Sequence, residues 1–141
     1  MAFSDTRKGG KITSRSGEPA PDQGLLGETV VEGDALSWDN GNNHWDKAFG
    51  DTAALKPVHA IAGRSGVAGE RIPLLTGCTM EGRITGATTG APIYLDNAAG
   101  KEGYWTGTAP GGGSGDDNTV YGFSQTPTRA VFQLPNVRTV A

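Results

Sequence analysis

Residues 33–40 read GDALSWDN, and residues 90–97 repeat the same pattern as GAPIYLDN. In both stretches a glycine is followed by an aliphatic residue after three positions, by a large apolar residue after five, and by Asp-Asn after six and seven. A small polar turn then leads to a tryptophan, which is Trp45 in the first copy and Trp105 in the second. These are the residue types of a β-hairpin, so the sequence predicts one β unit that is used twice.

The similarity continues downstream of both copies. VHAIA at 58–62 parallels VYGFS at 120–124, and RIPLL at 71–75 loosely parallels AVFQL at 130–134. The turn after the first copy contains Asn-Gly, which tolerates the positive φ angles of tight hairpins, so Trp38 and Trp45 are expected to form a cross-strand pair. The expected strands are residues 29–31, 35–38, 44–47, 58–62, 71–75, 79–84, 93–95, 103–106, 119–124 and 129–134.

Composition favours the same fold class. The chain has 141 residues, which fits one domain, and it contains 23 glycines and 8 prolines but only 19% charged residues. Much of the remaining polar content is Thr, Ser, Asn and Asp, which favour strands and turns over helices. We therefore expect an all-β protein: a small Gly-rich β-sandwich or barrel built from two similar hairpin units, with an extended N-terminal arm.

Three segments are expected along the chain. Residues 1–27 are rich in Ser, Thr, Gly, Pro and charge, and they form the arm. Residues 28–134 form the β domain, with a mobile Gly-rich loop at 107–118, and residues 135–141 form a short tail. Neither an apolar window of membrane-spanning length nor the apolar core of a secretory signal is visible, so we expect a soluble protein that first exists in a cytoplasm.

Charge separates the arm from the rest of the chain. Its four basic residues outweigh one acidic residue through position 15, which gives +3, whereas the whole chain carries −3 and residues 16–141 therefore carry −6. Four basic residues without interleaved aromatics are a poor footprint for nucleic acid, so we expect the arm to lie on an acidic protein surface. The arm residues expected to make that contact are Arg7, Lys8, Lys11 and Arg15.

No cofactor or metal site is predicted. Residues 39–43 (DNGNN) resemble a calcium loop, but the third position is Gly41 and the twelfth, where a bidentate Glu belongs, is Gly50. The glycine run at 111–115 is followed by two aspartates rather than by the lysine of a phosphate-binding loop. His44, His59 and Cys78 do not have zinc-ligand spacing.

Catalytic patterns are equally weak, so we expect no enzymatic activity. Neither Ser65 nor Ser114 lies in a G-x-S-x-G elbow, and Cys78 is most simply a small buried apolar residue. Two acidic pairs could serve glycoside hydrolysis, although acidic residues beside glycines are common in turns. These pairs are Glu32 with Asp34 and Asp116 with Asp117.

Four aromatic residues allow two interpretations. They could stack on a sugar if exposed, or pack in hairpins against the core or another subunit if half buried, and packing is the favoured interpretation. The residues considered for subunit or ligand contacts are Trp38, Trp45, Tyr104 and Trp105.

The order of the β motifs resembles a known family. The motifs are GDALSWD at 33–39, VHAIA at 58–62, AGERIPLL at 68–75, GAPIYL at 90–95, and VYGFS at 120–124 with RAVF at 129–132. Over residues 29–134 this succession resembles the capsid decoration, or cement, proteins of tailed bacteriophages and related small virion β proteins. Pro73 departs from the β-branched run usual in the third motif, and the arm has no clear counterpart.

The resemblance implies a non-enzymatic virion protein that binds the assembled major capsid protein and stabilises the head, often as a homotrimer. It would lie on the capsid surface, after a stage in the host cytoplasm, and would contact neither nucleic acid nor membrane. The alternative is a phage fibre, tail or spike module that binds a host surface glycan through exposed tryptophans.

Overall fold

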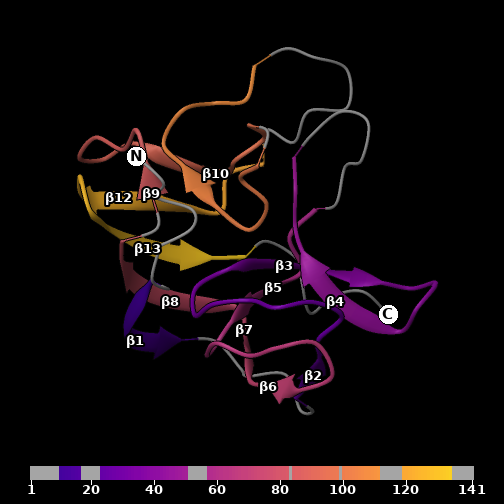
Figure 1. Cartoon of the computed structure of the whole chain (residues 1–141). Coiled ribbons are helices and arrows are strands. Elements are labelled where there is room, and N and C mark those ends of the chain that lie inside the picture. Colours follow the sequence, from indigo (N-terminus) through magenta and orange to yellow (C-terminus); the bar gives the residue numbers. More distant parts are fainter. Residues whose placement is uncertain are drawn as a thin grey trace.

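The computed structural model describes residues 10–16, 23–50, 57–82, 84–98, 100–111 and 119–134. Every regular element in these residues is a β-strand, so the predicted all-β fold class is confirmed. The strands form three sheets, whose members are labelled in Figure 1 where there is room. Within the described residues no helix is long and apolar enough to cross a membrane.

The largest sheet has seven strands in the order β1-β8-β13-β12-β10-β11-β9. Neighbours are antiparallel, except that β9 and β11 run parallel. Its strands are β1 (Lys11–Ser16), β8 (Gly77–Glu81), β9 (Ile84–Thr85), β10 (Pro92–Leu95), β11 (Trp105–Thr106), β12 (Gly122–Thr126) and β13 (Arg129–Gln133).

The two smaller sheets come from the first half of the chain. A four-stranded sheet has the order β4-β3-β5-β7, and a two-stranded sheet pairs β2 with β6. All of these pairs are antiparallel. The strands are β2 (Gly24–Leu25), β3 (Ala35–Asp39), β4 (His44–Lys47), β5 (Ala60–Ala62), β6 (Arg71–Ile72) and β7 (Leu74–Leu75).

The strand orders contain the predicted duplication. The strands β4-β3-β5-β7 form the whole four-stranded sheet, and β11-β10-β12-β13 lie side by side in the corresponding order within the seven-stranded sheet. We call these sets the first repeat and the second repeat. In both, the strand that carries the quoted octapeptide pattern lies between its hairpin partner and the next strand of the set.

The residue register is the same in the two repeats on one side of the central strand. Leu36 lies opposite Ala60 in the first repeat. Ile93 lies opposite Gly122 at the matching position of the second repeat. Leu36 and Ile93 are the aliphatic residues three positions after the glycine of each octapeptide, and both are fully buried.

The register also agrees on the other side of the central strand. Trp38 faces Trp45 in the first repeat, which confirms the predicted cross-strand pair. Leu95 faces Trp105 at the matching position of the second repeat. The sequence correspondence between residues 33–40 and 90–97 therefore extends to the residues that each strand pairs with.

The glycine that begins each octapeptide has the same role in both repeats. Gly33 has a φ of 90° and donates its N–H to the carbonyl of Ala62. Gly90 has a φ of 82° and donates its N–H to the carbonyl of Ser124, which is the residue equivalent to Ala62. A positive φ is strained for residues with a Cβ, so both positions favour glycine.

The third stretch of the repeat is offset from its sequence alignment. The alignment matches Leu74 with Gln133, whereas the strand register matches Leu74 with Ala130, three residues earlier. Pro73 lacks an N–H and separates β6, which pairs with β2, from β7 of the first repeat, so the expected strand at residues 71–75 is two short strands in different sheets. The loose sequence similarity of these stretches therefore did not predict which residues of them are structurally equivalent.

Most of the apolar core lies between the two repeats. It joins residues of the first repeat to the inner face of the second, and Cys78, predicted to be a small buried residue, is part of it. The cluster consists of Ala35, Ala48, Val58, Ile61, Leu75, Cys78, Met80, Ile93, Leu95, Trp105, Tyr121, Ala130, Phe132 and Leu134. A smaller cluster covers the other face of the first repeat: Leu26, Val30, Leu36, Ala60, Ala62, Ile72 and Leu74.

Residues assigned to the N-terminal arm contribute two strands. β1 pairs along β8, and β2 pairs with β6. The chain is anchored from Gly10, whose N–H donates to the carbonyl of Glu32 at 2.7 Å. The change of composition near residue 27 is therefore not the boundary of the sheets. Residues 1–9, with Arg7 and Lys8, lie outside the described part of the chain, as do residues 112–118 and 135–141.

The expected strand at residues 29–31 is reduced to a single β-bridge, and a turn follows it. Only Val30 makes a bridge, to Gly66. The carboxylate of Asp34 accepts the N–H of Val31 at 2.8 Å, and the N–H of Asp34 donates to the carbonyl of Val31 at 3.0 Å. This local pairing turns the chain directly after Val30, so the pairing with Gly66 does not extend into a strand.

Candidate functional site

The hairpin of β3 and β4 carries polar and aromatic groups that could contact a ligand. Its turn is held by Asp39, whose Oδ1 accepts the N–H groups of Gly41 at 3.0 Å and Asn42 at 3.3 Å. Asn43 adopts a φ of 57° and donates its N–H to the carbonyl of Asp39. Asn tolerates this left-handed conformation better than most residues, so the Asn-rich stretch favours a turn here.

The two faces of the hairpin differ in chemistry. Trp38 and Trp45 lie on one face with their ring centroids 5.5 Å apart in an edge-to-face arrangement. Asp39 lies opposite His44, and Ser37 lies opposite Asp46, on the other face. Trp45 packs against the smaller core cluster, whereas Trp38 remains 38% exposed. The hairpin therefore has one aromatic face and one face that carries carboxylate, hydroxyl and imidazole groups.

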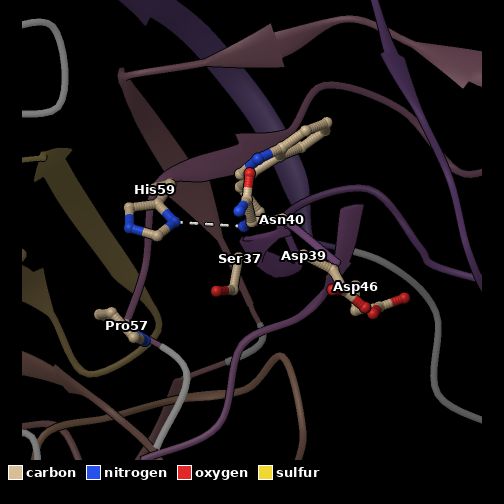
Figure 2. Close-up of a pocket in the computed structure, with 7 residues that line it drawn as sticks. Ser37, Asp39, Asn40, Asp46, Pro57 and His59 are labelled. Atoms are coloured by element: carbon tan, nitrogen blue, oxygen red, sulfur yellow. Dashed lines mark hydrogen bonds between the residues drawn. The ribbon is translucent and has the colours of Figure 1, made fainter. Parts of the chain in front are cut away.

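A shallow hollow of about 300 Å³ opens beside this hairpin (Figure 2). Its lining combines an exposed indole with hydroxyl, amide, carboxylate and imidazole groups, from β3, β4 and the segment that leads into β5. His59 is fixed there because its Nδ1 accepts the N–H of Trp38 at 3.1 Å. The lining residues are Ser37, Trp38, Asp39, Asn40, Asp46, Pro57 and His59.

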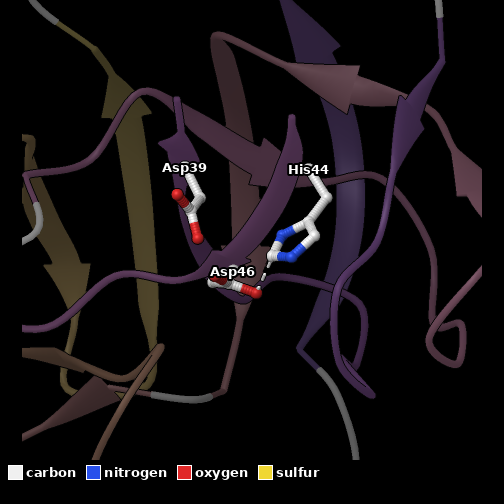
Figure 3. A group of neighbouring side chains, drawn as sticks. All are labelled: Asp39, His44 and Asp46. Carbon is white, nitrogen blue, oxygen red and sulfur yellow. Dashed lines mark ion pairs between the residues drawn. The ribbon is translucent and has the colours of Figure 1, made fainter. Parts of the chain in front are cut away.

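Three side chains of the polar face form a cluster (Figure 3). Nδ1 of His44 lies 3.4 Å from Oδ1 of Asp46, and one ligand atom each of Asp39, His44 and Asp46 lies within 4.8 Å of the others. Carboxylate and imidazole groups are ligands of divalent cations, so these are the described residues that could hold one. Gly27 closes over the cluster, because a Cβ there would come within 2.3 Å of His44 Nδ1.

Sequence reasoning did not find this cluster. It set His44 aside because its spacing to His59 and Cys78 matches no metal motif. The residues that approach His44 are instead its cross-strand neighbour Asp39 and its neighbour two positions along the same strand, Asp46. The available signal was the predicted hairpin itself, which places residues 39, 44 and 46 on one face.

Asp39 and His59, which line the hollow, both have lowered pKa values. The amide side chain of Asn42 donates to Asp39, and with the turn N–H groups it outweighs desolvation, so the pKa of Asp39 is lowered from 3.8. Partial burial lowers the pKa of His59 from 6.5, because the imidazolium form loses hydration there. His59 is therefore held in its neutral form, as required of an acceptor at Nδ1.

We expect the free energy of unfolding to fall as the pH decreases through 6.5. The pKa of His59 is lower in the folded state, so the unfolded state binds more protons in this range, and the His59 contribution is complete only above the unfolded pKa. His59→Asn keeps an acceptor but does not titrate, so urea unfolding at pH 7.5 and 5.5 should show a smaller pH effect in this variant. An unchanged pH effect would exclude His59 as its source.

The four aromatic residues considered for contacts occupy different environments. Trp38 is exposed and Trp45 is half buried, whereas Tyr104 is 1% and Trp105 0% exposed. Trp105 packs against Phe132 and donates its Nε1–H to the carbonyl of Gly33 at 2.8 Å. Tyr104 and Trp105 are therefore core residues, and Trp38 is the one of the four that is open to a ligand.

The basic and acidic residues singled out in the sequence are placed only in part. The backbones of Lys11 and Arg15 lie in β1, but their side chains are outside the described part. Glu32 accepts the N–H of Ile12 at 3.1 Å, and the fully buried Asp34 accepts that of Val31. These two carboxylates thus hold the backbone, and Asp116 and Asp117 lie outside the described residues.

The chain was compared with models of known protein families, with curated proteins and with solved structures. No significant match was found in any of the three comparisons.

Proposed function

We propose that the chain is a structural protein of a bacteriophage virion that binds the assembled major-capsid lattice and stabilises the head. The observation that carries the proposal is the order of the β motifs over residues 29–134, which resembles that of capsid decoration proteins. Each resembling motif includes a strand of one or other repeat, so the likeness concerns the scaffold rather than its loops. The protein is proposed to act without a cofactor and without catalysis.

The basic N-terminal segment is proposed to contact the major capsid protein. Arg7 and Lys8 precede Gly10, where the chain is anchored to Glu32, and β1 then forms an end strand of the seven-stranded sheet. Basic side chains can pair with an acidic partner surface, and repetition of the contact over a lattice raises the apparent affinity. We propose that the protein lies on the capsid surface. We also propose that copies of the chain associate with one another.

Deleting residues 1–9 tests the role of the segment without removing β1. We expect the truncated protein to keep its thermal midpoint but to occupy purified heads less fully in a co-sedimentation titration. Arg7→Glu should weaken occupancy through charge alone. Arg71→Glu, which reverses an exposed charge on β6, is the matched control and should bind normally. Full occupancy by the truncated protein and by Arg7→Glu would remove the segment from the interface.

A glycan-binding fibre, tail or spike module remains the second candidate, because of one observation. The exposed indole of Trp38 borders a hollow lined by carboxylate, amide and hydroxyl groups, and sugars are commonly bound by aromatic stacking with polar groups beside it. This function would be favoured over the first if the wild type bound a glycan array, Trp38→Ala did not, and neither of these two proteins bound to purified heads.

A further inference from the structure

The outward face of the seven-stranded sheet carries a row of apolar side chains. Phe123 on β12 lies opposite Pro92 on β10 and opposite Val131 on β13, so the three residues cross adjacent strands at one level. Pro92 is exposed, Phe123 is 49% exposed and Val131 is half buried. We call Pro92, Phe123 and Val131 the outer row.

The first repeat has an equivalent row, and it is covered. The register that aligns the repeats matches the outer row to Ala35, Ile61 and Leu75, which also cross three adjacent strands at one level. These residues are 0%, 0% and 3% exposed. They belong to the core cluster that contains the inner face of the second repeat. Within one chain, therefore, this face of the unit is covered by another β-sheet.

The surroundings of the outer row fit a contact with protein. Glu81 and Arg129, at one edge of the same face, form an ion pair with a separation of 2.9 Å, so this edge adds no net charge. Gln125 and Gln133 are exposed beside the row on β12 and β13. An apolar centre with a polar, hydrogen-bonding rim is the usual organisation of a protein interface.

We propose that a second copy of this chain packs on the outer row, sheet against sheet about a two-fold axis. The internal packing of the two repeats shows that the same face of this unit stacks on a β-sheet, and a second copy supplies an identical apolar row with a neutral rim. A two-fold contact uses one patch on both partners, which suits a self-complementary surface. This two-fold pairing departs from the homotrimer that the resemblance implies, and it does not depend on whether the chain binds a capsid lattice.

The first test compares Phe123→Glu with Val67→Glu by sedimentation over a concentration series. Val67 is a matched control, because it is 53% exposed but lies in a turn outside the outer row. We expect the wild type and Val67→Glu to form dimers. Phe123→Glu should be folded, by its thermal transition, and should dimerise at least about 30-fold more weakly, as for a central interface residue.

Cross-linking tests whether the outer rows of two copies face each other, and it uses a substitution that changes the side-chain shape little. Val131→Cys places a thiol in the outer row, and Cys78 is 1% exposed, so it should react little in the folded protein. A short bis-maleimide should yield covalent dimers of Val131→Cys but not of the control Val67→Cys. A wild type that stays monomeric, a trimer, equal dimerisation by Phe123→Glu, or equal cross-linking of the two cysteine variants would each overturn the proposal.

Discussion

Gly122→Ala is expected to lower the free energy of unfolding by about 3 kcal/mol or more, because it forces two paired strands apart. A Cβ at Gly122 would lie 2.2 Å from the carbonyl oxygen of Val131 and 3.0 Å from Cα of Phe132. Both are backbone atoms, so no side-chain rotation can relieve the contact. Urea unfolding followed by tryptophan fluorescence measures the loss directly.

The matched control for this substitution is Gly41→Ala in the turn between β3 and β4. A Cβ there would lie 3.5 Å from Oδ1 of Asp39, which is an ordinary contact, and Gly41 does not have a positive φ. We expect a change within about 0.5 kcal/mol, as for most surface substitutions. If Gly122→Ala proved as stable as Gly41→Ala, the close approach of β12 and β13 would be wrong.

Trp105→Ala is expected to cost about 3–5 kcal/mol, because it removes the largest side chain between the two repeats. The indole is fully buried, with its ring centroid 4.6 Å from that of Phe132 and 5.8 Å from that of Tyr121. It also joins the repeats through the hydrogen bond to Gly33. Trp105→Phe should recover part of the loss, since it keeps a ring but leaves that carbonyl without the indole donor.

Trp38→Ala is the comparison for the Trp105 variants. Trp38 is more than a third exposed, so its replacement should cost much less, mainly through the edge-to-face contact with Trp45, which is worth about 0.5–1.5 kcal/mol. Thermal unfolding of the two alanine variants under the same conditions checks the order. Equal losses would contradict the assignment of Trp105 to the core and of Trp38 to the surface.

The duplication could be predicted because the repeated positions hold residue types with strong local conformational preferences. The glycines of the octapeptides take positive φ angles, and the Asn-rich stretch forms the turn that brings Trp38 and Trp45 together. Leu36 and Ile93 could be matched because both are aliphatic and lie three residues after the glycine, and each is buried, Leu36 in the smaller core cluster and Ile93 in the larger. These signals depend on a few residues close in sequence. The predicted pairing of Trp38 with Trp45 is confirmed, but the positive φ expected of Asn-Gly in the turn lies at Asn43.

Strands held mainly by pairing to distant strands could not be found in this way. Residues 11–16 read KITSRS, a polar stretch whose extended form follows from its pairing with β8, far along the chain. Local composition gives no information about that partner, so the stretch was assigned to an arm. The shift of Leu74 relative to Ala130 has a similar cause, because register is set by the neighbouring strand.

The candidate site was predicted only in part. Trp38 and Trp45 were singled out from sequence, but their different exposure depends on how the hairpin packs against the smaller core cluster. The approach of His44 to Asp46 was missed, because metal motifs are defined by spacing along the chain, whereas this cluster forms across a hairpin. Side-chain exposure and cross-strand approach both require the fold.

The central proposal, a capsid decoration protein, is tested most directly by counting copies of the chain in the purified virion. Quantitative mass spectrometry against labelled standards gives the ratio of this chain to the major capsid protein. A protein that binds at each equivalent position of the lattice should be present at a fixed, high ratio to the major capsid protein. Because its binding sites are equivalent, all copies should dissociate from heads in a single transition. A handful of copies per particle, or none, would contradict the account.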